Sequence, residues 1–170
     1  DLLGADFTFA DPHVAAITLE QLSTHTSGLP RLPSNLGPNP DASTDPYAAY
    51  DRAALHAFLR TARLAGPAPH PAAYSNLGVG LLGDLLSQLY DQPWETLIVE
   101  RIARPLELTG VRMTPKPNDA ARLAPPFQGD QADHPWHFQA MAGAGALHAT
   151  AADLIRFGQA LLNPDATPLA

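Results

Sequence analysis

Residues 74–90 constrain the fold of this chain more than any other stretch, because they join a polar triplet to an apolar run of helical length. The triplet is Tyr74-Ser75-Asn76, and the run that follows has the sequence LGVGLLGDLLSQLY. Leucine recurs at every fourth residue of this run, and a second apolar stripe lies beside the first: Leu77, Leu81, Leu85 and Leu89, then Val79, Leu82 and Leu86. A helix that is apolar on most of its circumference is buried. We therefore predict a buried central helix that presents the triplet at its N-terminus.

Three glycines interrupt the apolar run, at Gly78, Gly80 and Gly83. Each glycine inside a helix costs about 1 kcal/mol relative to alanine, so three of them need a structural reason. We expect another part of the backbone to approach the helix closely along its glycine face.

The triplet by itself is also explained by simple capping, because Ser75 or Asn76 can accept a hydrogen bond from an amide of the first turn. Its neighbours make it more specific. ITLEQLSTHTSGLP (residues 17–30) precedes it, and AMAGAGALHATAADLIRFGQALL (residues 140–162) follows it. In this order, the three segments resemble the serine β-lactamase-like family, which includes class C β-lactamases, D,D-peptidases and related esterases.

The resemblance runs from about residue 17 to residue 162 and implies a fold class. The chain should be mainly α, the helical domain of the β-lactamase/transpeptidase-like fold, with long proline-rich loops and little strand. The resemblance also implies that Tyr74 is catalytic, that Asn76 binds a small-molecule or peptide substrate, and that no cofactor is needed. It suggests a periplasmic or secreted protein.

Two other motifs of that family are missing from these 170 residues. Its enzymes combine Ser-x-x-Lys, the Tyr-x-Asn or Ser-x-Asn triplet, and a Lys/His-x-Gly strand. No serine here is followed three residues later by lysine, the only lysine is Lys116, and no Lys/His-x-Gly occurs near the C-terminus. A serine nucleophile needs a base to take its proton, and backbone amides must hold the oxyanion. We therefore expect no nucleophile, no activating cation beside Tyr74 and no oxyanion strand, and no activity of the chain alone.

The simplest interpretation is that residues 1–170 are a single helical domain and a fragment of a longer α/β plus α enzyme. Its partner would then be the missing α/β half of the same protein. A non-catalytic helical binding module derived from the same family is the alternative, and an unrelated helical protein is a third hypothesis. Because β-lactamases, D,D-peptidases and esterases share these motifs, the resemblance leaves the substrate open.

Charge and composition exclude several other classes of protein. A net charge of −7 with only ten lysines and arginines argues against a nucleic-acid partner. The apolar runs are too short to span a membrane. His134 and His137 are three residues apart without a helical pattern around them, so no metal site is expected there. His25 and Ser27 are too close in sequence to form a catalytic pair, since such groups come from separate segments.

Capping patterns place the remaining helices. Thr18 and Gln21 have capping-box spacing and predict a short helix that buries Leu19 and Leu22. We expect a second helix that is capped by Asp45 or Asp51 and ends near Leu64, and its buried face should consist of Leu55, Phe58, Leu59 and Ala62. A third helix should run from about Pro93 to Pro105 and bury Trp94, Leu97, Ile98 and Ile102. A last helix should be capped by Thr150 with Asp153 and bury Leu154, Phe157 and Leu161.

Two proline-rich segments, residues 28–46 and 111–149, are too long for ordinary connections. They carry apolar residues that a solvated loop would not need: Leu29, Leu32, Leu36, Phe127, Trp136, Phe138 and Met141. Contiguous apolar surface is seldom left uncovered. We therefore expect these segments to face the missing half, and the isolated chain to self-associate, exchange segments between copies or leave these loops mobile.

Overall fold

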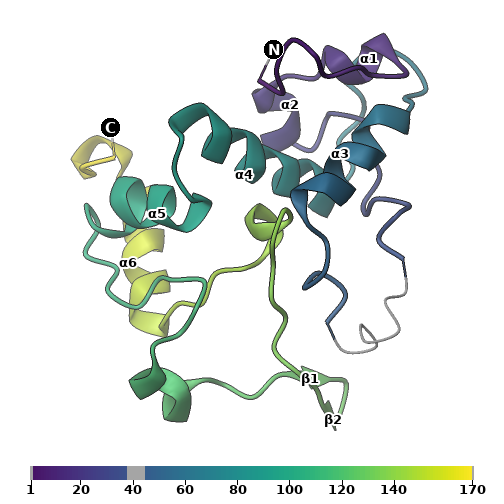
Figure 1. Ribbon diagram of the computed structural model, residues 1–170. Coiled ribbons are helices and arrows are strands. Elements are labelled where there is room, and N and C mark those ends of the chain that lie inside the picture. The colour runs from purple at the N-terminus through teal and green to yellow at the C-terminus, as the bar shows by residue number, and fades with distance from the viewer. Residues whose placement is uncertain (1, 38–44, 170) are drawn as a thin grey trace. The chain divides into compact units, whose positions relative to one another are not determined.

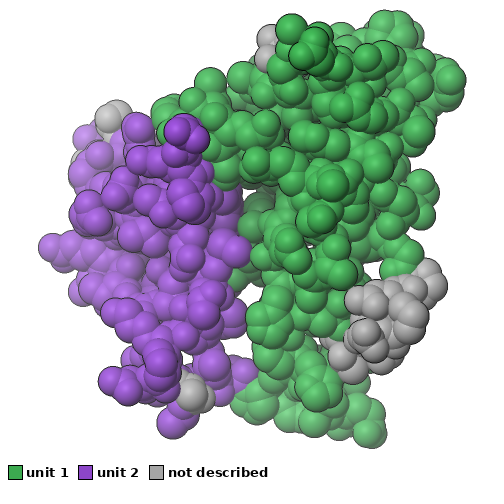
Figure 2. All heavy atoms as spheres, viewed as in Figure 1, with its two compact units in different colours: residues 1–90, 125–146 green, residues 91–124, 147–170 purple. Residues whose placement is uncertain are grey.

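A computed structural model describes residues 2–37 and 45–169 (Figure 1). The described residues divide into two compact units, coloured separately in Figure 2. Unit 1 comprises residues 1–90 and 125–146, and unit 2 comprises residues 91–124 and 147–170. Unit 1 contains α1 (Pro12–Ala15), α2 (Leu19–Ser23), α3 (Arg52–Thr61), α4 (Asn76–Tyr90), β1 (Phe127–Gln128), β2 (Gln131–Ala132) and the 3-10 turn η3 (Ala142–Ala144).

The regular structure of both units is mainly helical. Unit 2 contains α5 (Trp94–Ile98), the π-helical turn η1 (Val99–Ala103), the 3-10 turns η2 (Pro117–Arg122) and η4 (Pro164–Ala166), and α6 (Ala151–Leu162). Among the described residues, the only paired strands are β1 and β2, which form a short antiparallel hairpin with Gln128 opposite Gln131. The predicted mainly α class with little strand is confirmed.

Two helices of unit 1, α2 and α3, begin where their capping residues predict. Thr18 and Gln21 form a reciprocal capping box at the start of α2, and Leu22 is buried. Asp51 caps α3 by accepting a hydrogen bond from the backbone amide of Ala54 at 2.8 Å. The predicted face of this helix is buried as a whole: Leu55, Phe58, Leu59 and Ala62.

Helix α4 supplies the centre of the unit 1 core. Leu77, Leu81 and Leu85 are buried, and each such side chain contributes about 1.5–3 kcal/mol through its removal from water. The second stripe is only half-buried, and Leu89 is 52% exposed at the C-terminal end. Burial on most of the circumference, as predicted, is therefore wrong for the last turn of the helix.

Two of the α4 glycines, Gly80 and Gly83, are explained by close contact with η3 and the residue before it. A Cβ atom on Gly80 would lie 3.1 Å from the Cα atom of Met141, a residue that is completely buried. A Cβ atom on Gly143 would lie 2.4 Å from the carbonyl oxygen of Val79 and 3.4 Å from the Cα atom of Gly83. The predicted close approach of another backbone to this helix is confirmed.

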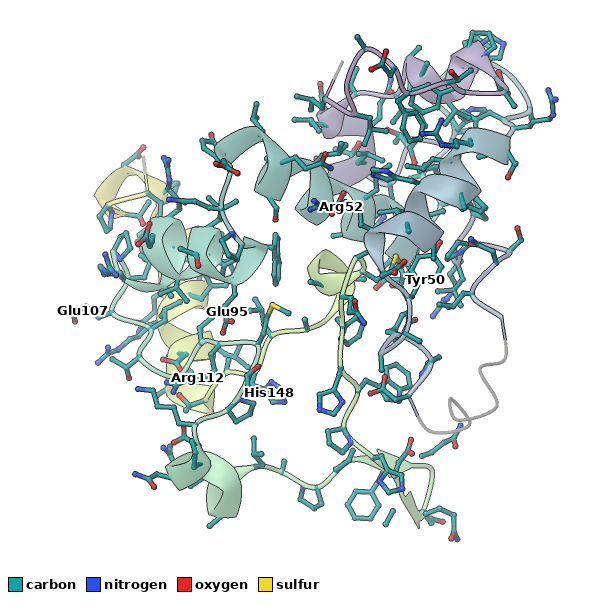
Figure 3. All side chains as sticks on the ribbon, viewed as in Figure 1. Tyr50, Arg52, Glu95, Glu107, Arg112 and His148 are labelled. Carbon is teal, nitrogen blue, oxygen red and sulfur yellow. The ribbon has the colours of Figure 1, made fainter. Side chains whose placement is uncertain are left out.

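One charged group is buried within α4. The Asp84 carboxylate accepts a hydrogen bond from Arg52 Nε of α3 at 2.7 Å and another from Gln88 Nε2 at 2.8 Å (Figure 3). Because both oxygens have partners, this carboxylate avoids the cost of an unpaired buried charge. The pair ties α3 to α4 and is structural.

The apolar residues of the two proline-rich segments have different environments. Leu29 and Met141 lie in the unit 1 core, and Phe138 stacks on Tyr47 with ring centroids 4.6 Å apart. Three others are exposed: Leu32 at 38%, Phe127 at 61% and Trp136 at 48%. The prediction that these segments carry an uncovered apolar surface is therefore wrong for Leu29, Phe138 and Met141, which pack within unit 1. Residues 38–44 of the first segment lie outside the described residues.

Unit 2 is organised around the segment that follows η1. Arg112 and His148 pair as an antiparallel bridge, with backbone hydrogen bonds of 3.1 and 2.7 Å in the two directions (Figure 3). The Glu95 carboxylate accepts from the amide of Met113 at 2.7 Å and so joins α5 to the same segment. Of the stripe predicted for this helix, Leu97 is buried, while Trp94, Ile98 and Ile102 are half-buried.

Helix α6 begins at the predicted capping box, with Thr150 and Asp153 bonded reciprocally. Its predicted burial is wrong. Leu154 is 62% exposed and Leu161 is 64% exposed, while Phe157 is half-buried and Asp153 is the buried residue of the helix. The amphipathic pattern is present, but among the described residues nothing covers its apolar side.

Candidate functional site

The triplet lies at the N-terminus of α4, and its middle residue is the cap. Ser75 Oγ accepts a hydrogen bond from the amide of Gly78 at 2.8 Å and donates to the carbonyl oxygen of Pro30 at 2.7 Å. Ser75 is almost fully buried, with 1% of its surface exposed. The Ser75 hydroxyl therefore makes two structural hydrogen bonds. Of the triplet, Tyr74 and Asn76 are the residues available for a chemical role.

Tyr74 is exposed directly before the helix. Its side chain retains 58% of its accessible surface, whereas Tyr47 and Tyr50 are buried in unit 1. Tyr50 donates its hydroxyl proton to Asn35 Oδ1 at 2.9 Å, and burial raises the pKa of Tyr50 to about 12 (Figure 3). Tyr50 therefore keeps its proton, and Tyr74 is the better candidate for proton transfer.

Two polar side chains contact the ring of Tyr74. The guanidinium carbon of Arg31 lies 5.3 Å from the ring centroid, and the imidazole of His25 lies 4.9 Å from it at an interplanar angle of 41°. A guanidinium within about 6 Å of an aromatic ring makes a cation–π contact. A cation therefore lies against the ring of Tyr74. This contact is to the ring and not to the hydroxyl, so the expectation of no activating cation stays a prediction.

Asn76 is the first residue of α4 and is half-exposed. Because Ser75 between them is the cap, Tyr74 and Asn76 flank the capping position at one end of the helix. The side chain of Asn76 is accessible to a ligand at this end, as a substrate-binding amide requires.

Arg31 and His25 were not identified as site residues from the sequence. No spacing rule connects residues 25–31 with residue 74, and the THTSG run is explained locally by structure. Ser27 is buried, and its hydroxyl oxygen accepts from the amide of Leu29 at 3.3 Å. His25 faces Tyr74 and the Ser75 amide, so the structure does not pair it with a serine hydroxyl.

One of the two histidines considered for metal binding, His137, has another side-chain partner. His137 Nδ1 lies 2.8 Å from Asp45 Oδ2, which also accepts from the His137 amide. Across residues 2–37 and 45–169, no group of three or more histidine, aspartate or glutamate side chains is placed to hold a metal ion. In the same described ranges, no helix is both long enough and apolar enough to cross a membrane.

A hollow of about 730 Å³ lies within unit 2, lined by α5, η1, α6 and the segment between residues 107 and 116. Its lining combines two carboxylates, Glu95 and Glu107, with four cationic side chains: Arg104, Arg112, Lys116 and Arg156. Arg112 is held by Asp119, 3.3 Å away, and by backbone carbonyls (Figure 3). Tyr74 and Asn76 are not among the residues that line this hollow.

Comparison with known proteins identifies the family. The family model described as Beta-lactamase matches residues 6–169. The D-alanyl-D-alanine-carboxypeptidase/endopeptidase AmpH of Escherichia coli K12 is 34% identical over 149 residues, and AmpH of strain O157:H7 is equally similar. This match covers 88% of the chain. The chain belongs to the β-lactamase family.

A solved structure agrees with this assignment. A Yersinia pestis β-lactamase/D-alanine carboxypeptidase, crystallised with citrate, superposes with a TM-score of 0.66 at 28% identity. The match covers 82% of this chain but 38% of that structure, and the chain spans 37% of the length of AmpH. The similarity therefore concerns a part of these longer relatives.

Proposed function

We propose that this chain is the helical part of a serine hydrolase that acts on D-alanyl-D-alanine peptides or β-lactams through an acyl-enzyme. Tyr74 transfers a proton at its hydroxyl, and Asn76 binds the acyl part of the substrate. The observation that carries the proposal is an exposed Tyr74 beside a cation at the N-terminus of a buried helix. The D-alanyl-D-alanine activity named for the relatives supports this substrate class.

In the proposed reaction, some catalytic groups come from this chain and the others from polypeptide outside it. A serine hydroxyl attacks the carbonyl carbon of the substrate while a neighbouring group accepts its proton and later donates it to the leaving amine. Tyr74 is suited to this exchange because it is exposed and held in place. The serine, the lysine and the oxyanion amides come from polypeptide outside the 170 residues, so the chain alone is inactive.

We further propose that the same additional polypeptide packs on α6. Leu154, Ile155, Leu161 and Leu162 are each more than 60% exposed. They lie at positions i, i+1, i+7 and i+8 and therefore share one face of the helix. The matched relatives are more than twice as long as this chain, which supports the proposal that further polypeptide covers this face. Without it, the face favours self-association of the chain.

A chimera tests the catalytic assignment. The matched region of E. coli AmpH is replaced by this chain, and hydrolysis of a D-Ala-D-Ala peptide is measured. Loss of general acid–base catalysis lowers rates about 10²–10⁴-fold, so Tyr74→Phe should lower kcat/KM at least about 100-fold. Tyr90→Phe, at the other exposed end of α4, is the matched control and should change kcat/KM less than about twofold.

Fluorescent penicillin separates the proposal from the alternative of a binding module. The chain alone should form no covalent adduct, whereas the chimera should be labelled and Asn76→Ala should weaken the labelling. A chimera that remains fully active with Tyr74→Phe would contradict the catalytic assignment. Covalent labelling of the 170-residue chain itself would contradict its predicted inactivity.

A further inference from the structure

The segment of residues 25–31 is bonded along its length to the segment that leads into α4. The carbonyl oxygens of Thr26 and Arg31 accept from the amides of His70 and Leu77, at 2.8 and 3.2 Å. The two segments are also closely packed at Gly28, in the middle of residues 25–31. A Cβ atom on Gly28, which has a φ of +76°, would lie 2.4 Å from the His70 ring. The two segments therefore form one local structure, although 45 positions separate Pro30 from the Ser75 hydroxyl that bonds to it.

His25 holds the backbone on both sides of Tyr74. Its carbonyl oxygen accepts from the amide of Ala73 at 2.9 Å, and its Nδ1 accepts from the amide of Ser75 at 3.2 Å. His25 has a φ of 59°, in the left-handed region that non-glycine residues rarely occupy. Such a conformation persists only where its surroundings enforce it, and here it lets one residue bind the amides before and after Tyr74.

The hydrogen bond from Ser75 defines the chemical state of the imidazole. A backbone amide can only donate, so Nδ1 is the acceptor in this bond, and the tautomer that fits carries its proton on Nε2. Alanine at position 25 lacks this acceptor. Asparagine carries an amide oxygen close to the position of Nδ1 and can accept the same bond.

Core packing does not account for this arrangement. Tyr74 is 58% exposed, and an exposed aromatic side chain normally keeps its rotameric freedom. Here the ring is contacted by His25 and Arg31 while most of its surface remains accessible. The contacts therefore order a side chain that the core does not need.

We propose that His25 is a positioning residue for Tyr74: it fixes the backbone on both sides of the tyrosine and orders the ring together with Arg31. The proposal rests on the proposed function in that Tyr74 takes part in the reaction. It explains the THTSG segment, which contributes no group to the chemistry, as the part that places the tyrosine for proton transfer.

Nuclear magnetic resonance on the ¹⁵N-labelled 170-residue chain tests the placement directly. A through-hydrogen-bond coupling between the Ser75 amide nitrogen and His25 Nδ1 is expected. A net hydrogen bond of about 0.5–1.5 kcal/mol corresponds to up to about tenfold in protection, so His25→Ala should accelerate exchange of the Ser75 amide by up to about tenfold. His25→Ala should also move the Tyr74 ring signals towards free-tyrosine values, and His25→Asn should restore Ser75 protection.

The controls separate positioning from general stability. Amides in the middle of α3 and α4 should keep their shifts and protection in both variants, because the amides that His25 accepts from, those of Ala73 and Ser75, lie before α4 begins. Absence of the coupling, or an unchanged Ser75 exchange rate in His25→Ala, would overturn the proposal. So would a His25→Asn variant that resembles His25→Ala, because any substitution would then have the same effect.

The AmpH chimera connects the placement to the reaction. His25→Ala should lower kcat with little change in KM, and His25→Asn should recover most of the loss. A chimera that is inactivated by Tyr74→Phe but unaffected by His25→Ala overturns the positioning role. A chimera that Tyr74→Phe leaves active contradicts the proposed function instead, and the resonance measurements on the chain then still decide the placement.

Discussion

Helices α4 and α6 both carry apolar stripes but have opposite surroundings. In α4 the stripe of Leu77, Leu81 and Leu85 is buried against the rest of unit 1, and its glycines admit another backbone. In α6 the leucines of the stripe are more than 60% exposed, and a Cβ atom on Gly158 would meet nothing within 4 Å. The same kind of pattern thus belongs to a completed core in one helix and to an uncovered surface in the other.

The two helices are consequently held by different forces. Apolar burial stabilises α4, whereas α6 is attached to unit 2 through polar contacts at its N-terminal half. Asp153 accepts from the Thr150 hydroxyl at 2.7 Å and from the Gly110 amide at 3.4 Å, and Arg156 donates to the carbonyl oxygen of Glu107 at 2.8 Å. An amphipathic pattern predicts that a helix has an apolar face, but the pattern does not identify what covers it.

The largest change in the free energy of unfolding is expected for a substitution in the α4 core. Leu77→Ala removes a side chain with no exposed surface, and such truncations cost about 2–5 kcal/mol because they also leave a cavity. Leu89→Ala, on the same helix but 52% exposed, should change the free energy of unfolding by no more than about 0.5 kcal/mol. Urea unfolding followed by circular dichroism measures both, and equal losses would show that α4 is not divided into a buried and an exposed end.

A smaller loss of stability is expected when the polar contacts at the N-terminal half of α6 are removed. Asp153→Ala removes a capping-box carboxylate and should cost about 1–2 kcal/mol, whereas Asp165→Ala, an exposed control in unit 2, should cost almost nothing. Burial acts to raise the pKa of Asp153, but hydrogen bonds from Thr150 and Gly110 outweigh it and lower the pKa below the ordinary value of 3.8.

The sign of the pH dependence follows from that lowered pKa. A carboxyl group whose pKa is lower in the folded state stabilises the fold fully above its unfolded pKa and loses this contribution as the pH falls through the folded value. The difference in unfolding free energy between the wild type and Asp153→Ala should therefore be constant near neutral pH and shrink below about pH 3.8. Thermal unfolding over a pH series measures it, and a difference that grows in acid would contradict the assignment.

The smallest effect on stability is expected on the apolar face of α6. A Leu154→Ser/Leu161→Ser double variant should change the free energy of unfolding by no more than about 0.5 kcal/mol, because both side chains are already exposed. It should nevertheless reduce concentration-dependent association in sedimentation velocity. Ala152→Ser, exposed on a different face of the helix, is the control. Strong destabilisation by the double variant would mean that the chain covers this face itself.

Local features of the fold were accessible from the sequence because they depend on neighbouring residues. The capping boxes at Thr18 and Thr150 form as their spacing predicts, since a cap involves residues only three positions apart. The glycines of α4 predicted close backbone contact, although η3 could not be identified as the contacting segment. The fragment interpretation, the single-domain expectation for residues 1–170 and the catalytic role of Tyr74 remain predictions.

The sequence by itself determined the family, the mainly helical class and the position of Tyr74 before α4, because these follow from motifs and periodicity along the chain. Only the tertiary structure decided that Arg31 and His25 lie against Tyr74, since more than 40 positions separate them and no periodic pattern records the contact. Only the tertiary structure likewise decided that α4 is covered and α6 is not. The hydrophobicity of a side chain sets the free energy that is gained when it leaves water. Whether the side chain is buried depends on whether another surface packs against it.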